Sequence, residues 1–173
     1  KNVAAGNSGL IPPNRLIGKD IEEITLDGVK MVFQDVSDTE APVEMNTWFP
    51  QFKALWSSEL VTGTIHNIYT LRGAAVRNAN NWSKEINETL YRFGGEAEVM
   101  FASHSWPRWG NDRIKEVLRT QRDAYANLNN QTLHYVNQGV TINEIHNVYE
   151  VPQSLQQSWA ARSYHGDVQN NVR

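Results

Sequence analysis

The spacing of hydrophobic and polar positions divides the 173-residue chain into a strand-rich part and a helical part. Residues 1–19, rich in Gly, Asn and Pro, have no regular spacing, which indicates a loop. β-Branched and apolar residues at Ile21–Leu26 and Val29–Val36 flank the turn pair Asp27-Gly28, and this arrangement predicts a β-hairpin. Three further short apolar runs have the length of strands, at residues 45–49, 53–57 and 98–102.

Helical spacing replaces this pattern twice. Between residues 74 and 93 apolar positions recur at steps of three and four, and Gly94-Gly95 end the run, which predicts a helix. Beyond residue 112 all of the spacing is helical. The helices expected there cover residues 113–128 and 131–138 and begin again at Thr141, with Glu144 as its capping partner, and at Pro152. Strands with one helix, followed by helices alone, predict an α/β portion at residues 1–111 and an all-α portion at residues 112–173.

Composition narrows the class of protein. A hydrophobic content of 40% and six Trp indicate a globular protein with a core. A net charge of −3 argues against nucleic acid as a partner, because neutralising phosphates needs a surplus of Lys and Arg. No apolar run approaches the roughly 18–20 residues of a transmembrane helix. The absence of Cys excludes disulfides and thiolate chemistry, and the start at Lys1, without a leader, is expected to be internal.

Three side chains of the kinds that bind metal ions lie in the loops that follow predicted strands. Glu40, Glu59 and His104 each come after an apolar run, and the rim beyond the strand ends is where α/β sheets bind ligands. Taken singly, each residue is explained as a solvated loop acid or a packing histidine. Taken together, two carboxylates and an imidazole are donors that Zn²⁺ accepts, and a carboxylate can bridge two metal ions. Their spacing alone is a weak signal and does not by itself lead to a metal site.

Asn67 and Arg72 are candidates for binding an anionic group. The planar guanidinium suits sulfate, phosphate or carboxylate oxygens, and the amide adds a neutral donor. Gly73 is expected to allow close approach of the backbone. The alternative is that Asn67 caps a turn and Arg72 pairs with a surface acid. Arg77 lies five residues beyond Arg72, off its helical face, and is interpreted as structural.

The histidines differ in their surroundings. His165, between Tyr164 and Gly166, lies in a sequence typical of a functional loop. His66 is interpreted as a packing residue or as one that supports the site from outside. The Trp-Pro-Arg-Trp-Gly run at 106–110 predicts a rigid packing turn, with an indole lining a substrate pocket as the alternative.

Several of these motifs together resemble the alkyl sulfatases of the metallo-β-lactamase superfamily, the bacterial enzymes that degrade sodium dodecyl sulfate. The resemblance runs from about residue 10 to the end of the chain. The motifs that carry it are TEAP, SSE, HNIYTLRGAAVRNANNWS, ASHSWPRWG, RTQRDAYANLNNQTLHYVNQG and YHGDVQNNVR.

The resemblance implies a binuclear zinc centre held by an HxHxDH loop, two glutamates and a further histidine. Glu40, Glu59 and His104 match the glutamates and that histidine. Asn67 and Arg72 match residues that hold the sulfate, and His165 matches an active-site histidine that donates a proton or orients the sulfate. HxHxDH is missing from the sequence. The remaining zinc ligands are therefore expected outside this chain, which we expect to be inactive in isolation.

The implied fold is α/β: the second half of a metallo-β-lactamase αββα sandwich at residues 1–111, followed by the start of an all-α dimerisation segment at 112–173. The implied function of the intact protein is hydrolysis of alkyl sulfate esters, such as dodecyl sulfate, to alcohol and sulfate. Its expected partners are the missing N-terminal half of the catalytic domain and a second copy in a homodimer. A periplasmic or secreted location is favoured. The alternatives are a metallo-hydrolase of another anionic ester, such as a phosphodiester, and a non-catalytic dimerisation fragment.

Overall fold

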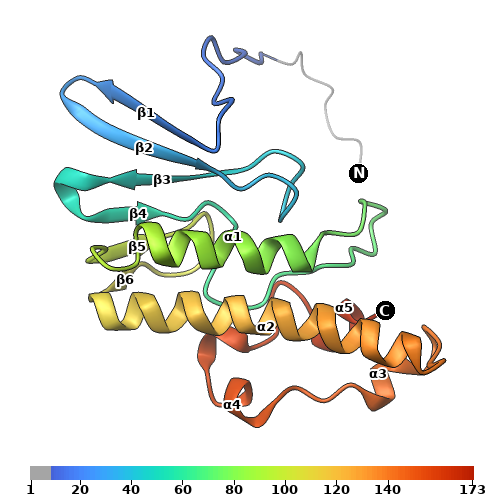
Figure 1. The fold of residues 1–173 in the computed structure, drawn as a ribbon. Coiled ribbons are helices and arrows are strands. Elements are labelled where there is room, and N and C mark those ends of the chain that lie inside the picture. Colours follow the sequence, from blue (N-terminus) through green and yellow to red (C-terminus); the bar gives the residue numbers. More distant parts are fainter. Residues whose placement is uncertain (1–8) are drawn as a thin grey trace, which may run out of the picture.

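The computed structural model describes residues 9–173 and contains a six-stranded mixed sheet with helices (Figure 1). The part of the predicted loop at residues 1–8 lies outside the described residues. In spatial order the strands are β1 (Ile21–Leu26), β2 (Val29–Asp35), β3 (Met45–Phe49), β4 (Ala54–Trp56), β5 (Val99–Phe101) and β6 (Arg108–Trp109). The helices are α1 (Ala79–Arg92), α2 (Asn111–Asn137), α3 (Ile145–Val148), α4 (Gln153–Gln156) and α5 (Val168–Asn171), with 3₁₀ turns η1 (Pro50–Phe52) and η2 (Trp159–Ala161).

The predicted hairpin and the three predicted strands are confirmed. Asp27 and Gly28 both have positive φ, 49° and 81°, as the two-residue turn between β1 and β2 requires. The prediction for the Trp-Pro-Arg-Trp-Gly run was wrong in part. Its Arg108 and Trp109 pair with β5 as strand β6, and the side chains of Trp106 and Trp109 are exposed. A strand of two residues is too short for alternation to reveal it in the sequence.

Strand direction places three strand ends at one edge of the sheet. β3 is antiparallel to both β2 and β4, and β5 is parallel to β4. The carboxyl ends of β2, β4 and β5 therefore point the same way, toward the end of the sheet where α1 begins (Figure 1). The loops that leave these strands carry Glu40, Glu59 and His104.

Helix α1 packs on one face of the sheet. The rings of Trp48 and Phe93 stack with centroids 5.7 Å apart, and the Asn46 amide donates to the Thr89 hydroxyl at 2.9 Å. The predicted start of this helix at residue 74 was wrong. The helix starts at Ala79 because the Asn78 side chain caps it. Before the cap the chain is bonded to the loop at 65–70, where the Arg77 N–H donates to the Ile68 carbonyl at 3.0 Å.

Helix α2 is continuous, whereas the sequence predicted two helices with a break after residue 128. Relative to alanine, an Asn pair at 129–130 costs a helix about 1 kcal/mol, less than the packing of the apolar stripe yields. That stripe shares the core of the sheet and of α1, and the rings of Tyr125 and Trp82 stack at 4.5 Å. The core of the described chain thus continues across residues 111 and 112, and the domain boundary there stays a prediction about the intact protein.

The remaining helices are single turns. Thr141 does not begin a helix, although Glu144 accepts hydrogen bonds from its N–H at 3.1 Å and its hydroxyl at 2.6 Å, as the capping pattern predicts. Pro152 is the N-cap of α4. Within residues 9–173 no helix is long and apolar enough to cross a membrane. A mixed sheet with helices is confirmed, while the sandwich and the dimerisation segment stay predictions.

Candidate metal centre and anion pocket

The loop that carries Glu40 is fixed at both ends. It follows β2, and it closes where the Val36 N–H donates to the Glu44 carbonyl at 2.9 Å and the Thr39 hydroxyl donates to the Val36 carbonyl at 2.6 Å. The Asn78 side chain, at the start of α1, donates to the Asp38 carboxylate at 2.8 Å. These hydrogen bonds hold the Glu40 loop near the amino end of α1.

The loops that carry Glu59 and His104 are bonded to each other. Parallel pairing of β4 and β5 continues beyond the strands, because the Ser103 N–H donates to the Ser58 carbonyl at 2.8 Å. The Glu59 N–H donates to the Glu44 carboxylate at 2.7 Å, which joins this pair of loops to the Glu40 loop. All three predicted ligand loops thus meet at one edge of the sheet.

Four side chains of types that can bind a metal ion converge there. Glu40, Glu59 and His66 each offer a ligand atom within 4.8 Å of the others. Nε2 of His66 lies 3.4 Å from one oxygen of Glu59, and Nε2 of His104 lies 3.5 Å from the other. The structure therefore brings together the predicted Glu40, Glu59 and His104, and adds His66, which the sequence interpretation had left outside the site.

His66 is held by the core beneath it. Its side chain is buried, its N–H donates to the Tyr125 hydroxyl at 3.1 Å, and its ring lies 5.7 Å from that of Trp82. Burial lowers the pKa of His66, although the adjacent Asn67 carbonyl, 3.2 Å from Nδ1, acts in the opposite direction. A neutral imidazole is the form that binds a metal ion. The residues that position His66 come from α1 and α2, far away in sequence.

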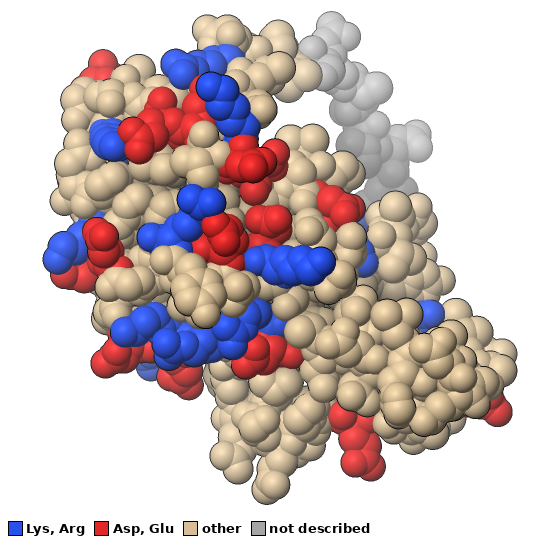
Figure 2. Space-filling model, in the orientation of Figure 1, with Lys and Arg blue, Asp and Glu red and all other residues tan. Residues whose placement is uncertain are grey.

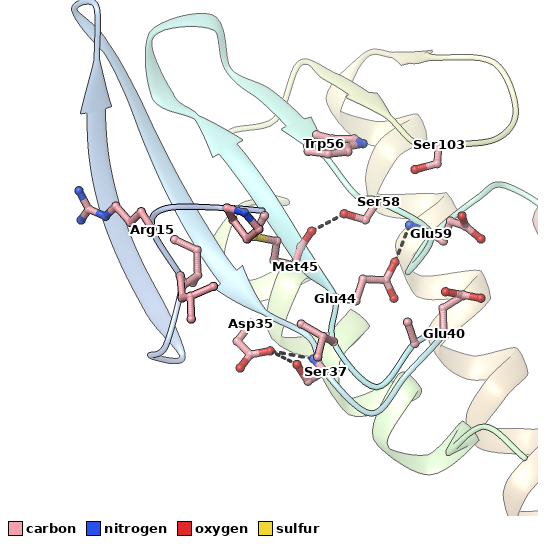
Figure 3. Close-up of a pocket in the computed structure, with 15 residues that line it drawn as sticks. Arg15, Asp35, Ser37, Glu40, Glu44, Met45, Trp56, Ser58, Glu59 and Ser103 are labelled. Atoms are coloured by element: carbon pink, nitrogen blue, oxygen red, sulfur yellow. Dashed lines mark hydrogen bonds between the residues drawn. The ribbon is translucent and has the colours of Figure 1, made fainter. Parts of the chain in front are cut away.

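Glu44 is a third acid at this edge that the sequence interpretation missed. Burial, with smaller contributions from the nearby Glu40 and Glu59, raises the pKa of Glu44 to about 7, although the bond from the Glu59 N–H opposes the shift. Glu40, Glu44 and Glu59 line one end of a cavity of about 500 Å³, whose other walls include Met45 and Trp56 (Figure 3). In the sequence nothing marks Glu44, because its role depends on a contact with a residue 15 positions away.

Arg77 connects this centre to the candidate anion site. Its side chain is 10% exposed and forms an ion pair with Glu40, whose backbone carbonyl it also contacts. Its Nη1 donates to the Asn67 carbonyl at 3.1 Å and to the Asn67 side-chain oxygen.

The predicted anion-binding residues line one pocket. Asn67, Arg72 and His165 surround a hollow of about 430 Å³, in which Arg72 is exposed. The Asn67 amide donates to the His165 carbonyl at 3.1 Å. The His165 ring lies 5.6 Å from the ring of His66 and 4.6 Å from that of His104. This pocket therefore adjoins the carboxylate cluster, the name used below for Glu40, Glu59, His66 and His104.

The C-terminal segment brings His165 to the site by backbone pairing. The Ile65 N–H donates to the Arg162 carbonyl at 2.9 Å, and the Gly166 N–H donates to the Ile65 carbonyl at 3.0 Å. A Cβ on Gly166 would lie 2.4 Å from the His66 carbonyl oxygen, so the segments approach too closely for any side chain there. No protein atom lies within 4 Å of a Cβ added at Gly73, whose φ is 89°, so close approach of the backbone there stays a prediction.

The charged side chains on the face shown in Figure 2 are of both signs and interleaved. They gather over the sheet, α1 and the beginning of α2, while the end of the molecule near α3 is mostly uncharged on this face.

The chain is similar over its whole length to sulfatases. It is 42% identical over 173 residues to the alkyl/aryl-sulfatase BDS1 of Saccharomyces cerevisiae, covering all of this chain and 27% of that protein. It is 41% identical to an (R)-specific secondary-alkylsulfatase of Pseudomonas sp., covering 95% of this chain and 25% of that protein. A solved stereoselective inverting sec-alkylsulfatase from Pseudomonas sp. superposes with a TM-score of 0.91 at 40% identity, over 94% of this chain and 26% of that one.

The chain resembles part of an alkylsulfatase. It spans about a quarter of the length of the curated alkylsulfatases that it matches. No protein-family profile matches the sequence. The proteins it matches are named as sulfuric ester hydrolases, which confirms the resemblance that the motifs predicted.

Proposed function

We propose that this chain forms part of a zinc-dependent alkylsulfatase, which hydrolyses alkyl sulfate esters such as dodecyl sulfate to alcohol and sulfate. The observation that carries the proposal is the convergence of Glu40, Glu59, His66 and His104 beside the pocket of Arg72. It occurs in a chain about 40% identical to named alkylsulfatases. The zinc requirement, the choice of substrate and the residue roles are parts of the proposal.

The donor set suits zinc. Carboxylate oxygens and imidazole nitrogens are its usual ligands, and burial favours the neutral form of His66 that metal binding needs. Glu40, Glu59 and His104 are the proposed ligands, with His66 as a fourth candidate. Zinc, when bound, supplies Lewis acidity toward the ester and makes water nucleophilic near neutral pH.

The chain's own residues supply the rest of the chemistry. Arg72 binds the sulfate oxygens through its planar fork of donors, and Asn67 adds a neutral hydrogen bond. Their interactions gain strength as charge develops on those oxygens. His165, whose ring lies near those of His66 and His104 and which lines the same pocket as Arg72, is the proposed catalytic residue. It passes a proton from its imidazole nitrogen to the bridging ester oxygen, which leaves with the alcohol if water attacks sulfur and with the sulfate if water attacks carbon.

The rest of the protein is also part of the proposal. We infer that the remaining zinc ligands and the other half of an αββα sandwich come from sequence outside this chain. We further propose a homodimer in which residues 112–173 begin the interface, and a periplasmic or secreted location.

The test uses a protein of the relatives' full length that carries this sequence. It is assayed on dodecyl sulfate and on an aryl phosphodiester, before and after removal of metal by a chelator and after addition of zinc. We expect turnover of the sulfate only, loss with the chelator and recovery with zinc. Preferential cleavage of the phosphodiester, or full activity without metal, would contradict the proposal. Water labelled with ¹⁸O then distinguishes attack at carbon, which labels the alcohol, from attack at sulfur.

A further inference from the structure

We propose that Arg77 is a positioning residue that couples the metal centre to the anion pocket by holding Glu40 with one part of its guanidinium and Asn67 with another. The inference rests on the proposed function of the site. It gives a role to a side chain that sequence spacing alone had left as structural.

Arg77 forms hydrogen bonds to residues of two different loop positions and so links them. Glu40 belongs to the loop after β2, and Asn67 to the loop between β4 and α1, 27 positions further on. Arg77 contacts both the backbone and the side chain of each residue. Its own backbone is fixed as well, because its N–H donates to the Ile68 carbonyl at 3.0 Å. The guanidinium can therefore move little without moving Glu40 or Asn67.

The bond to Arg77 sets which way the Asn67 amide points. Its oxygen accepts from Arg77, so its NH₂ group faces His165 and the pocket, where it donates to the His165 carbonyl at 3.1 Å. A side-chain amide that turns over exchanges donor and acceptor. Without Arg77, the Asn67 oxygen would be free to face the pocket, where it would repel a sulfate oxygen. Arg77 thus acts on the anion without touching it.

On its other side, Arg77 fixes a proposed metal ligand. The side chain of Glu40 is 15% exposed, and its carboxylate pairs with Nη2 of Arg77 while Nε contacts the Glu40 carbonyl. Residues that orient a metal ligand from behind change metal affinity by about 10- to 100-fold when they are replaced. Lysine carries the same charge at one point only and cannot hold two residues at four atoms. The structure therefore requires arginine at this position.

The test compares Arg77→Lys with Arg72→Lys in the full-length protein. Both keep the charge, but only Arg77 contacts Glu40 and Asn67, whereas Arg72 lines the anion pocket. Zinc affinity is measured by competition with a chelator, and sulfate affinity by inhibition with inorganic sulfate. We expect Arg77→Lys to weaken both zinc and sulfate binding by about tenfold or more. We expect Arg72→Lys to weaken sulfate binding alone.

Two further variants separate positioning from general destabilisation. Arg77→Ala with added guanidinium ion should recover part of its zinc and sulfate affinity, a result that a loss of folding would not give. The effects of Arg77→Lys and Asn67→Ala on sulfate affinity should be non-additive, because both act through one amide.

Unchanged zinc and sulfate affinities in a folded Arg77→Lys variant, with the parent protein active, would overturn this inference alone. A parent protein that binds no zinc would overturn the proposed function and the coupling with it.

Discussion

The carboxylate cluster and the anion pocket lie side by side but are built differently. Glu40 and His66 have side chains that are only 15% and 6% exposed, and each is held by bonds to other elements. Arg72 is exposed on a turn, and among the described residues it forms no ion pair. Glu40 and His66 are consequently fixed by the fold, whereas Glu59 and His104 are 31% and 42% exposed. Arg72 also lies at the surface.

This difference predicts that substitutions in the two regions affect different properties of the protein. Substitutions in the cluster should change stability and metal affinity, because His66 contacts Trp82 of α1 and Tyr125 of α2 in the core. Substitution of Arg72 in the pocket should weaken anion binding and leave stability and metal affinity unchanged. The predictions below use that contrast.

The largest effect is expected for Arg72→Ala in the full-length protein. Removing a donor aimed at developing charge costs about 10²- to 10³-fold in turnover. Sulfate-ester hydrolysis is measured together with zinc content, which we expect to be unchanged because Arg72 lies outside the ligand cluster. Loss of zinc in this variant would make Arg72 a structural residue of the cluster.

Gly166→Ala tests how closely the C-terminal segment packs on the site. The added methyl group would lie 2.4 Å from the His66 carbonyl oxygen and 2.5 Å from the Asn67 nitrogen, so one backbone must move. We expect the free energy of unfolding of the chain to fall by about 1–3 kcal/mol, as overpacking in a close-packed region typically costs. Denaturant titration measures this change.

Gly95→Ala is the matched control, since no atom lies within 4 Å of its added Cβ. A similar loss in both variants would show that the effect does not come from contact with the site.

The pKa of Glu44 predicts a dependence of stability on pH in the metal-free chain. The folded pKa of about 7 exceeds the ordinary value of 4.5, so the native state retains a proton that the unfolded state releases. Stability from this group is present below pH 4.5 and is lost as pH rises to about 7. The loss should be on the order of 1–3 kcal/mol.

Unfolding measured from pH 4.5 to 7.5 tests this dependence, with Glu44→Gln as the comparison. The variant keeps an oxygen acceptor for the Glu59 N–H but does not titrate. Equal slopes for both proteins would contradict the assignment.

The smallest effect is expected from zinc on the isolated chain. A partial ligand set binds metal weakly, and zinc near its dissociation constant raises the free energy of unfolding by only about 0.4 kcal/mol. Glu59→Gln should abolish this increment, because Glu59 contacts both His66 and His104. Two tightly bound zinc ions per chain would show instead that the chain holds a complete site.

Local chemistry made parts of this architecture predictable. The Asp27-Gly28 turn defined the hairpin because few residues adopt positive φ, and apolar runs defined β3, β4 and β5. Glu40, Glu59 and His104 each follow a predicted strand, but the resemblance to alkyl sulfatases, not their spacing, predicted them as one ligand set. Their meeting at one edge depends on the strand directions, which the structure supplies. The start of α1 was missed because apolar spacing continued N-terminal of its cap, in which the Asn78 side chain accepts from the Asn81 N–H. The strand β6 was missed because two residues are too few to show alternation.

The sequence by itself determined which side chains are available: the acids and histidine at strand ends, the arginine after Asn67, and the motifs shared with alkylsulfatases. Only the tertiary structure decided that His66 enters the cluster, that Glu44 is partly buried near two other acids, and that Arg77 joins Glu40 to Asn67. The physical reason is range. Turns and periodicity express interactions between near neighbours, whereas pKa shifts and ion pairs arise from groups that folding brings together across tens of residues.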